Sequence, residues 1–286
     1  MESLAAAHSV ALTAHTAAQQ TAGGRPIAPE PTDARSGSAR ARLVDAAISL
    51  VAGPPPSAAI VGRATRANAF GAEAVGIRAV AEAAGLTHAA PLHHFPDRVS
   101  LLAAVSAEGN RRLATALETA YEAEKDRGTR SALGAVVRAQ AMWAAHNPGL
   151  WDVMVNPQLT ADTAAVWRGR QTDTPAAQML APGNESAASP AAARALARRA
   201  ETFDELVDAK LQVLDAYVEA VHVVQPHELN SSLVSSADRR PLVGALTTIA
   251  DGLSMQFVAE RGTSDEVLAS HVDRTLDLLL SGVLRS

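Results

Sequence analysis

Apolar positions recur at helical spacing along most of this chain, and the strict alternation typical of strands is rare. One run places four small or apolar residues on a single helix face: Ile77, Val80, Ala81 and Ala84. Gly85 follows this run, and glycine is the residue that most readily adopts the left-handed conformation at a helix end. A second short run spans about residues 88–95. The pattern predicts two short helices joined by a tight turn.

Residues around the turn fit this interpretation. Thr87 offers a hydroxyl that can cap the second helix, and Leu86 can pack beneath the turn. Pro91 falls near the first turn of the second helix, where a missing amide donor costs little. A helix-turn-helix of this kind presents its second helix to the major groove of DNA. An ordinary helical hairpin is the alternative, because Ala-Ala-Gly turns are common in alanine-rich chains.

The segment after the turn reads His94-Phe95-Pro96-Asp97-Arg98, with Leu101-Leu102 beginning a long helix. Together with the segment from Arg42 to Leu50, which looks like the family's first helix, this resembles the DNA-binding domain of the TetR/AcrR-like transcriptional regulators. The resemblance is specific over residues 40–52 and 70–105 and weaker elsewhere. It implies an all-α, homodimeric, ligand-responsive repressor that binds a palindromic operator.

The chain departs from the family pattern at three places. Leu92 stands where the family usually has a tyrosine that contacts phosphate, and Gly76 stands where a threonine or serine often caps the first of the two helices. Residues 53–68, GPPPSAAIVGRATRAN, occupy a position where the family has a loop of a few residues. We interpret this stretch as a surface insertion. Arg63 and Arg66 within it either contact phosphate or belong to a flexible loop without a role.

We expect three segments. Residues 1–36 form a disordered tail, residues 37–98 form a helix-turn-helix DNA-binding domain with the insertion at 53–68, and residues 99–286 form a helical ligand-binding and dimerisation domain. Polar residues with scattered Pro and Gly at 168–192 predict a long connection within the last segment.

Charge and composition refine this picture. The net charge of −5 is unevenly distributed, because residues 35–98 carry +3 while residues 99–286 carry −6. A segment of net positive charge followed by a longer segment of net negative charge is typical of a protein that binds the phosphates of nucleic acid through one part of its chain. The absence of cysteine excludes thiolate metal sites and disulfides and fits a cytoplasmic protein. No apolar run approaches the roughly 18–20 residues of a membrane span.

An enzyme is the main rival class. The sequence lacks a G-x-S-x-G elbow, an H-E-x-x-H pair, a phosphate-binding glycine loop and a cysteine nucleophile. His88, His93 and His94 raise the question of zinc, but no carboxylate or thiol completes a tetrahedral set. We therefore expect no enzyme activity, no cofactor and no metal.

Candidate DNA contacts follow from the position of the second helix and from the resemblance. His88, Ala89 and His93 are placed to approach base edges, since the start of a recognition helix enters the groove. Thr87, Arg78 and Arg98 are candidates for phosphate contacts. His94 is a structural histidine or a further contact. The expected DNA-binding set is thus Arg78, Thr87, His88, Ala89, His93 and Arg98.

Aromatic residues and methionine cluster in the middle of a chain that has only nine aromatic residues in all. Such clusters suit a small-molecule pocket, although each residue can equally belong to the core. The stretch Trp143 to Met154, with the sequence NPGLW inside it, is similar to a helical pair in many TetR-like effector domains. The expected ligand-binding residues are Trp143, His146, Trp151, Met154, Trp167 and Tyr217.

The last two expected helices, about residues 239–260 and 264–284, each carry an apolar stripe. In TetR-like proteins these helices form a four-helix dimer interface, whereas in this chain the stripes can equally close the core of one protomer. The expected interface residues are Leu246, Leu253, Phe257, Leu276 and Leu279. The main prediction is a DNA-binding repressor. The alternative is a helical small-molecule-binding protein whose DNA-binding domain is degenerate and binds DNA weakly.

Overall fold

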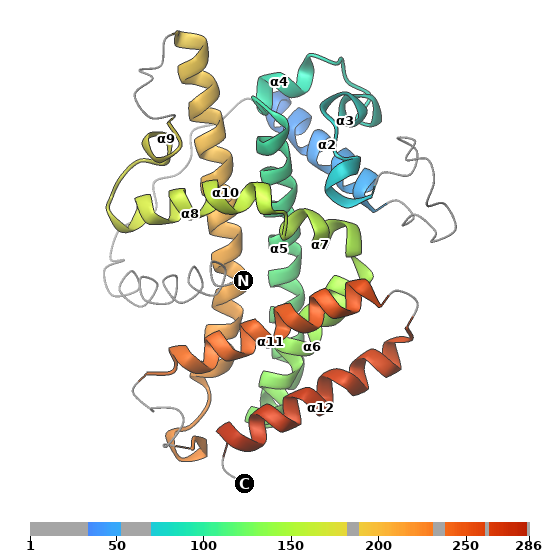
Figure 1. Ribbon diagram of the computed structural model, residues 1–286, viewed down its shortest axis with the longest axis vertical. Coiled ribbons are helices and arrows are strands. Elements are labelled where there is room, and N and C mark those ends of the chain that lie inside the picture. Colours follow the sequence, from blue (N-terminus) through green and yellow to red (C-terminus); the bar gives the residue numbers. More distant parts are fainter. Residues whose placement is uncertain (1–33, 53–69, 182–188, 231–237, 261–262, 285–286) are drawn as a thin grey trace. The chain divides into compact units, whose positions relative to one another are not determined.

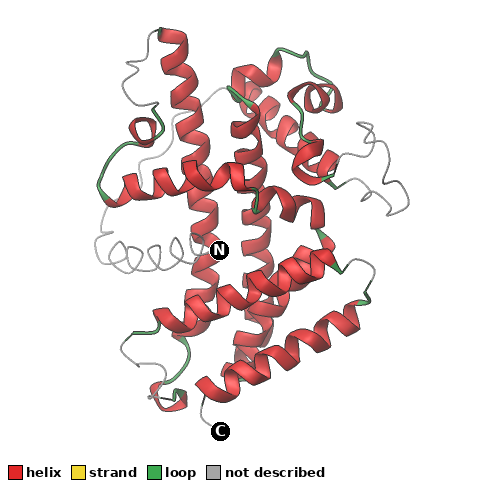
Figure 2. Cartoon of the chain, viewed as in Figure 1, coloured by secondary structure: helices red, strands yellow, loops and turns green. Residues whose placement is uncertain are grey.

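The computed structural model describes residues 34–52, 70–181, 189–230, 238–260 and 263–284. These residues form helices and loops, as Figure 2 shows, and the described part contains no strand beyond a single bridge between Leu229 and Leu284. The all-α prediction is confirmed. The expected insertion at 53–68 and most of the expected tail lie outside the described residues.

The chain divides into two compact units. The head unit comprises the described residues of 34–109 and 148–209, and the body unit comprises those of 110–147 and 210–284. Two long helices, α5 (Arg98–Glu124) and α10 (Pro190–His222), contribute one part to each unit. The head unit therefore contains helices from both the expected DNA-binding segment and the expected ligand-binding segment.

Within the head unit, the described part of the expected DNA-binding segment consists of one long helix and the three short elements of the helix-turn-helix motif (Figure 1). These are α2 (Ala34–Val51), η2 (Gly71–Ala74), α3 (Ile77–Ala83) and α4 (Ala90–His94), followed by α5. The unit also contains α7 (Pro148–Met154), α8 (Pro157–Gln171), α9 (Ala176–Met179) and the first part of α10.

Apolar side chains from several helices form the core of the head unit. Phe95 is fully buried at the end of α4, and burial of such a side chain contributes on the order of 2–3 kcal/mol. Val80 and Ala81 are buried on α3, as the sequence predicts, while Ile77 is half-buried. Further fully buried core residues of this region include Leu43, Ala47, Val51, Val75, Leu101 and Leu102.

The body unit contains the second part of α5, η3 (Lys125–Arg127), α6 (Thr129–His146), the second part of α10, η4 (Pro226–Glu228), α11 (Arg240–Ala259) and α12 (Asp265–Val283). Helix α6 packs against both α11 and α12. Within the described part, α11 is the one helix long and apolar enough to cross a membrane by length and composition. Because its apolar face is buried against other helices of the unit, it has the character of a core helix. The sequence predicts this helix at about residues 239–260 but does not single it out as apolar enough to span a membrane, because glycine, threonine and serine interrupt its apolar run.

The turn between α3 and α4 has the geometry that the sequence predicts. Gly85 has a φ of +64°, in the left-handed region. The Leu86 amide donates to the Ala81 carbonyl at 2.9 Å, and the Gly85 amide donates to the Glu82 carbonyl at 3.0 Å. This pair of bonds is a Schellman motif, which uses two otherwise unpaired carbonyls at the helix end.

We predict that Gly85→Ala lowers the free energy of unfolding by about 1 kcal/mol, because a side chain disfavours a positive φ. Chemical denaturation of the two proteins measures this difference. Gly76→Ser is the matched control, since Gly76 has an extended backbone, no neighbour within 4 Å of an added Cβ and a capping position without a side-chain bond. That variant should gain a few tenths of a kcal/mol. Equal losses in both variants would contradict the prediction.

Candidate nucleic-acid interface

The second helix of the motif is shorter than the sequence predicts. Helix α4 begins at Ala90, and residues 87–89 form a turn in which the Ala90 amide donates to the Thr87 carbonyl at 3.0 Å. Ala89 is the N-cap and no side chain caps the helix, so the expected capping role of Thr87 is wrong. Pro91 lies in the first helical turn, as expected. Because Pro91 lacks an amide hydrogen, it is tolerated at that position and not farther along the helix.

Five residues around α4 expose their side chains to solvent: Thr87, His88, Ala89, Leu92 and His93. We call this set the reader surface. Pro91 and Phe95 are buried behind it and anchor the segment to the core. Leu92, at 49% exposure, is a large apolar side chain on this surface, where an apolar group can contact a thymine methyl. Arg78, on α3, is also exposed.

Arg98 differs from the other candidate DNA contacts, because backbone carbonyls engage its guanidinium group. Its Nε donates to the Val75 carbonyl at 2.8 Å, and its Nη2 donates to the Ala72 carbonyl at 2.5 Å. Val75 and Ala72 are themselves buried. Arg98 thus holds the segment between η2 and α3 against the start of α5, which leaves less of the guanidinium for phosphate than the sequence led us to expect.

Two further side chains support backbone groups of the short helices. The Ala72 amide donates to Asp152 Oδ2 at 2.9 Å, which links η2 to α7. Arg42 Nη2 donates to the Ala84 carbonyl at 2.6 Å and so covers the carboxyl end of α3. Asp152 had no role in the sequence interpretation, since nothing in its local pattern indicates a partner some 80 residues earlier.

Ion pairs join α10 to the motif. Arg199 bridges two carboxylates, with Asp97 at 2.5 Å and Asp162 of α8 on the other side. Asp97 also accepts hydrogen bonds from the amide and hydroxyl of Ser100, at 2.7 and 2.8 Å, and thereby caps the start of α5. Arg40 of α2 pairs with Glu205 of α10 at 2.5 Å. These pairs are partly exposed, so each is expected to contribute no more than about 1 kcal/mol.

We predict that Arg98→Ala destabilises the DNA-free protein by about 1–3 kcal/mol, because the buried Val75 carbonyl loses the guanidinium donor and the Ala72 carbonyl keeps only the bond from the Val75 amide. Thermal or chemical denaturation without DNA measures the effect. Arg78→Ala removes the same charge from an exposed position of α3 and should leave stability unchanged. If Arg98→Ala folds as stably as the parent and only its DNA affinity falls, Arg98 is a phosphate contact.

The pKa of His94 is lowered from its ordinary 6.5, first by burial and then by the positive charges of Arg40, His93 and Arg198. The unfolded chain therefore takes up this proton at a higher pH than the folded chain does. We predict that stability falls as the pH drops below about 6.5. Melting temperatures of the parent and His94→Gln between pH 7.5 and 5 isolate this contribution, and identical pH profiles would refute it.

The expected ligand-binding residues are divided between the two units. In the head unit, Trp151 and Met154 are buried on α7, and Trp167 is half-buried on α8. The indole nitrogens of Trp151 and Trp167 are both buried and find no hydrogen-bond acceptor among the described residues. Buried polar groups normally have a partner, so these two N–H groups are available to an acceptor on a ligand or to water.

The other three belong to the body unit. Tyr217 is fully buried, its hydroxyl donates to Gln140 Oε1 at 2.9 Å, and Gln140 Nε2 donates to Asp251 Oδ1 at 2.7 Å. Burial, and secondly the charge of Asp251, raises the pKa of Tyr217 well above its ordinary value. Trp143 is half-buried, whereas His146 is exposed and lies 2.9 Å from Asp265. Tyr217 is thus part of a buried polar chain that connects α10, α6 and α11.

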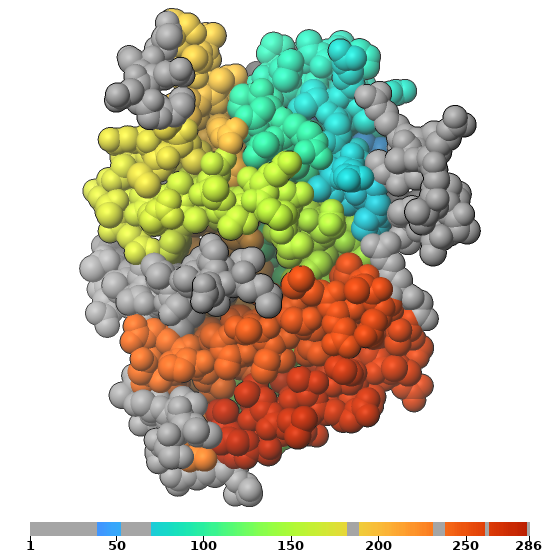
Figure 3. Space-filling model, in the orientation of Figure 1, coloured from blue at the N-terminus to red at the C-terminus, as the bar shows by residue number. Residues whose placement is uncertain are grey.

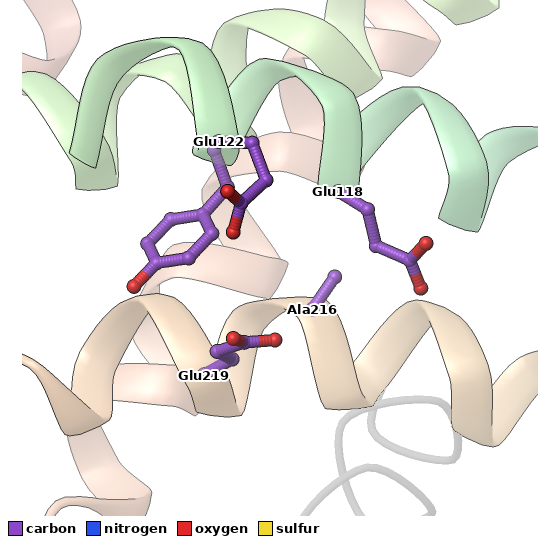
Figure 4. Close-up of a pocket in the computed structure, with 5 residues that line it drawn as sticks. Glu118, Glu122, Ala216 and Glu219 are labelled. Carbon is purple, nitrogen blue, oxygen red and sulfur yellow. The ribbon is translucent and has the colours of Figure 1, made fainter.

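The body unit contains a cavity of about 220 Å³ between α5 and α10 (Figure 4). Five residues line it: Glu118, Tyr121, Glu122, Ala216 and Glu219. None of them is among the expected ligand-binding residues. Burial and the neighbouring Glu219 raise the pKa of Tyr121, while Glu122 pairs with Lys125 at 2.6 Å. Three carboxylates around one opening favour cations over anions.

The expected dimer residues are engaged within the protomer. Leu246, Leu253, Phe257 and Leu276 are buried, and Leu279 is half-buried. Other apolar side chains of α11 and α12 are exposed: Met255 at 61%, Val267 at 55% and Leu278 at 80%. Figure 3 shows that α11 and α12 together form a broad continuous part of the surface in that view.

Comparison with protein-family models and with curated proteins finds no match. Solved structures with a similar arrangement include a protein of unknown function from Rhodococcus sp. RHA1, with a TM-score of 0.49 and 18% identity over 92% of this chain and 100% of that one. A putative TetR-family transcriptional regulator from Rhodococcus sp. aligns with a TM-score of 0.45 and 18% identity, over 86% of this chain and 100% of that one. A bacterial regulatory protein in the TetR family from Rhodococcus RHA1 aligns with a TM-score of 0.46 and 18% sequence identity, over 86% of this chain and 96% of that one.

Proposed function

We propose that this protein is a DNA-binding transcriptional regulator, a ligand-responsive repressor that binds a palindromic operator as a homodimer in the cytoplasm. The observation that carries the proposal is the reader surface. It exposes Thr87 and His88 in the turn before α4 and His93 on α4 itself, directly after a left-handed Gly85 turn. That is the arrangement in which a helix-turn-helix offers side chains to base edges and phosphates.

The charge distribution supports nucleic acid as the partner. Residues 35–98 carry seven arginines against four acidic residues, although the whole chain has a net charge of −5. Net positive charge in the segment that contains the reader surface attracts the phosphate backbone, and the net negative charge of the remaining chain limits non-specific binding.

A second copy of the chain is the proposed partner for α11 and α12. Met255, Val267 and Leu278 are large apolar side chains that remain exposed on these two helices. A two-fold contact across this surface buries them and presents two reader surfaces to the two halves of a palindrome, roughly 34–36 Å apart or somewhat more.

The effector is proposed to act through the helices that hold the motif. Asp152 of α7 accepts a hydrogen bond from η2, and Arg199 of α10 pairs with Asp97, the residue that caps α5. Asp162 of α8 holds Arg199 from the other side. Trp151 and Trp167 lie on α7 and α8 and offer unpaired N–H groups. A small molecule bound there shifts helices that directly position η2 and α5. Linkage then requires that operator and effector weaken each other's binding equally.

The second candidate function is a helical small-molecule-binding protein whose head no longer reads DNA. The exposure of Leu92, where the family has a phosphate-contacting tyrosine, favours this candidate. It predicts weak DNA binding without sequence preference, whereas the repressor predicts a selective complex.

We predict that Thr87→Ala combined with His88→Ala abolishes selective DNA binding and leaves the oligomeric state unchanged. The assay compares DNA flanking the protein's own gene with scrambled DNA across a salt series, and uses random-sequence selection if neither is preferred. Thr119→Ala with His227→Ala, at exposed positions of the body unit, is the matched control. Undiminished operator affinity of the first variant would remove the reader surface from the DNA interface.

A further inference from the structure

We propose that the first turns of α10 form a second contact to the DNA backbone, in which Arg194 and Arg198 bind phosphates that flank the sequence read by α4. The inference rests on the proposed function. It adds a helix outside the helix-turn-helix to the DNA interface and assigns to it a sequence-independent role.

Contacts within the head unit fix the position of this helix. Arg40 of α2 pairs with Glu205, and Arg199 pairs with Asp97 at the start of α5. Arg198 lies seven residues before Glu205, which is two helical turns, so both are on the face of α10 that is directed toward the motif. In agreement, the charge of Arg198 acts on His94 of α4.

Arg194 lies one turn farther toward the amino end on the same face, about 6 Å along the axis from Arg198. Figure 1 shows the first turns of α10 extending past the level of α4 at the same end of the head unit. A duplex that reaches the reader surface therefore comes close to this part of α10.

The sequence of this helix end explains how it projects without support. Residues 189–194 are exposed, and the segment PAAARALARR contains mainly alanine and arginine. Both have high helix propensity, so the turns remain helical without packing on a neighbour. Alanine side chains are also small, which permits a close approach to another molecule.

Both arginines have charge available for a ligand. Arg194 is exposed and has no acidic partner among the described residues. Arg198 is half-buried, and its Nε is buried without a hydrogen-bond acceptor in the described part. By contrast, Arg40 and Arg199 of the same region are paired with carboxylates. A planar guanidinium binds phosphate oxygens in a bidentate manner, which suits these two residues to the DNA backbone.

The experiment compares Arg194→Ala, Arg198→Lys and Arg194→Ala/Arg198→Ala with the parent protein, each as the full chain with its melting temperature checked. Fluorescence anisotropy gives affinities for operator and scrambled duplexes at several salt concentrations. Loss of Arg194 should weaken binding to both duplexes, lower the slope of log affinity against log salt by about 1, and leave the preference for operator unchanged. The double variant should lower the slope by about 2.

Arg168→Ala is the matched control, because Arg168 is an exposed arginine of α8 in the same unit. If it changes the salt slope as much as Arg194→Ala does, only net charge matters and the proposal is wrong. A duplex with trimmed flanks should make the parent and Arg194→Ala bind equally, and a persisting difference would overturn the assignment to flanking phosphates. If the parent prefers the operator and Arg194→Ala shows the same slope of log affinity against log salt, this inference alone is wrong. If the parent shows no preference for the operator over the scrambled duplex, the proposed function is wrong.

Discussion

Short helices leave most of their own backbone groups without internal partners, and in the interior of a protein each such group must find one elsewhere. The motif of this chain consists of elements of four, seven and five residues. Their free carbonyls and amides are paired by Arg42, Arg98 and Asp152, which come from α2, α5 and α7. The position of the reader surface therefore depends on side chains that lie outside the motif.

This dependence links the proposed reading of DNA to the rest of the head unit. A rigid motif with its own core would be insensitive to events in neighbouring helices. Here α7 holds η2 through Asp152, and α10 holds the start of α5 through Arg199 and Asp97. A ligand that moves α7, α8 or α10 by a small distance must alter these bonds, which gives an effector a direct physical path to the reader surface.

The apolar stripes of the last two helices illustrate where pattern alone is ambiguous. Leu246, Leu253 and Phe257 share a helix face, and such a face serves equally well inside a protomer or between two. Their burial against the protomer's own helices removes them from the exposed surface, so a partner would meet residues such as Met255 and Leu278 instead. The ligand-binding prediction has a related weakness, because Trp151 and Tyr217 belong to different compact units.

The sequence by itself determined the helical class, the left-handed turn at Gly85 and the exposed segment around His88 and His93, because these follow from local periodicity and backbone preference. It did not determine the start of α4, the carbonyl bonds of Arg98 or the pairing of Arg199. The bonds of Arg98 and Arg199 join residues that are between 23 and 102 positions apart. Only the tertiary structure decided them, since a long arginine side chain is equally suited to a phosphate, a carboxylate or a carbonyl and takes whichever acceptor the fold brings within reach.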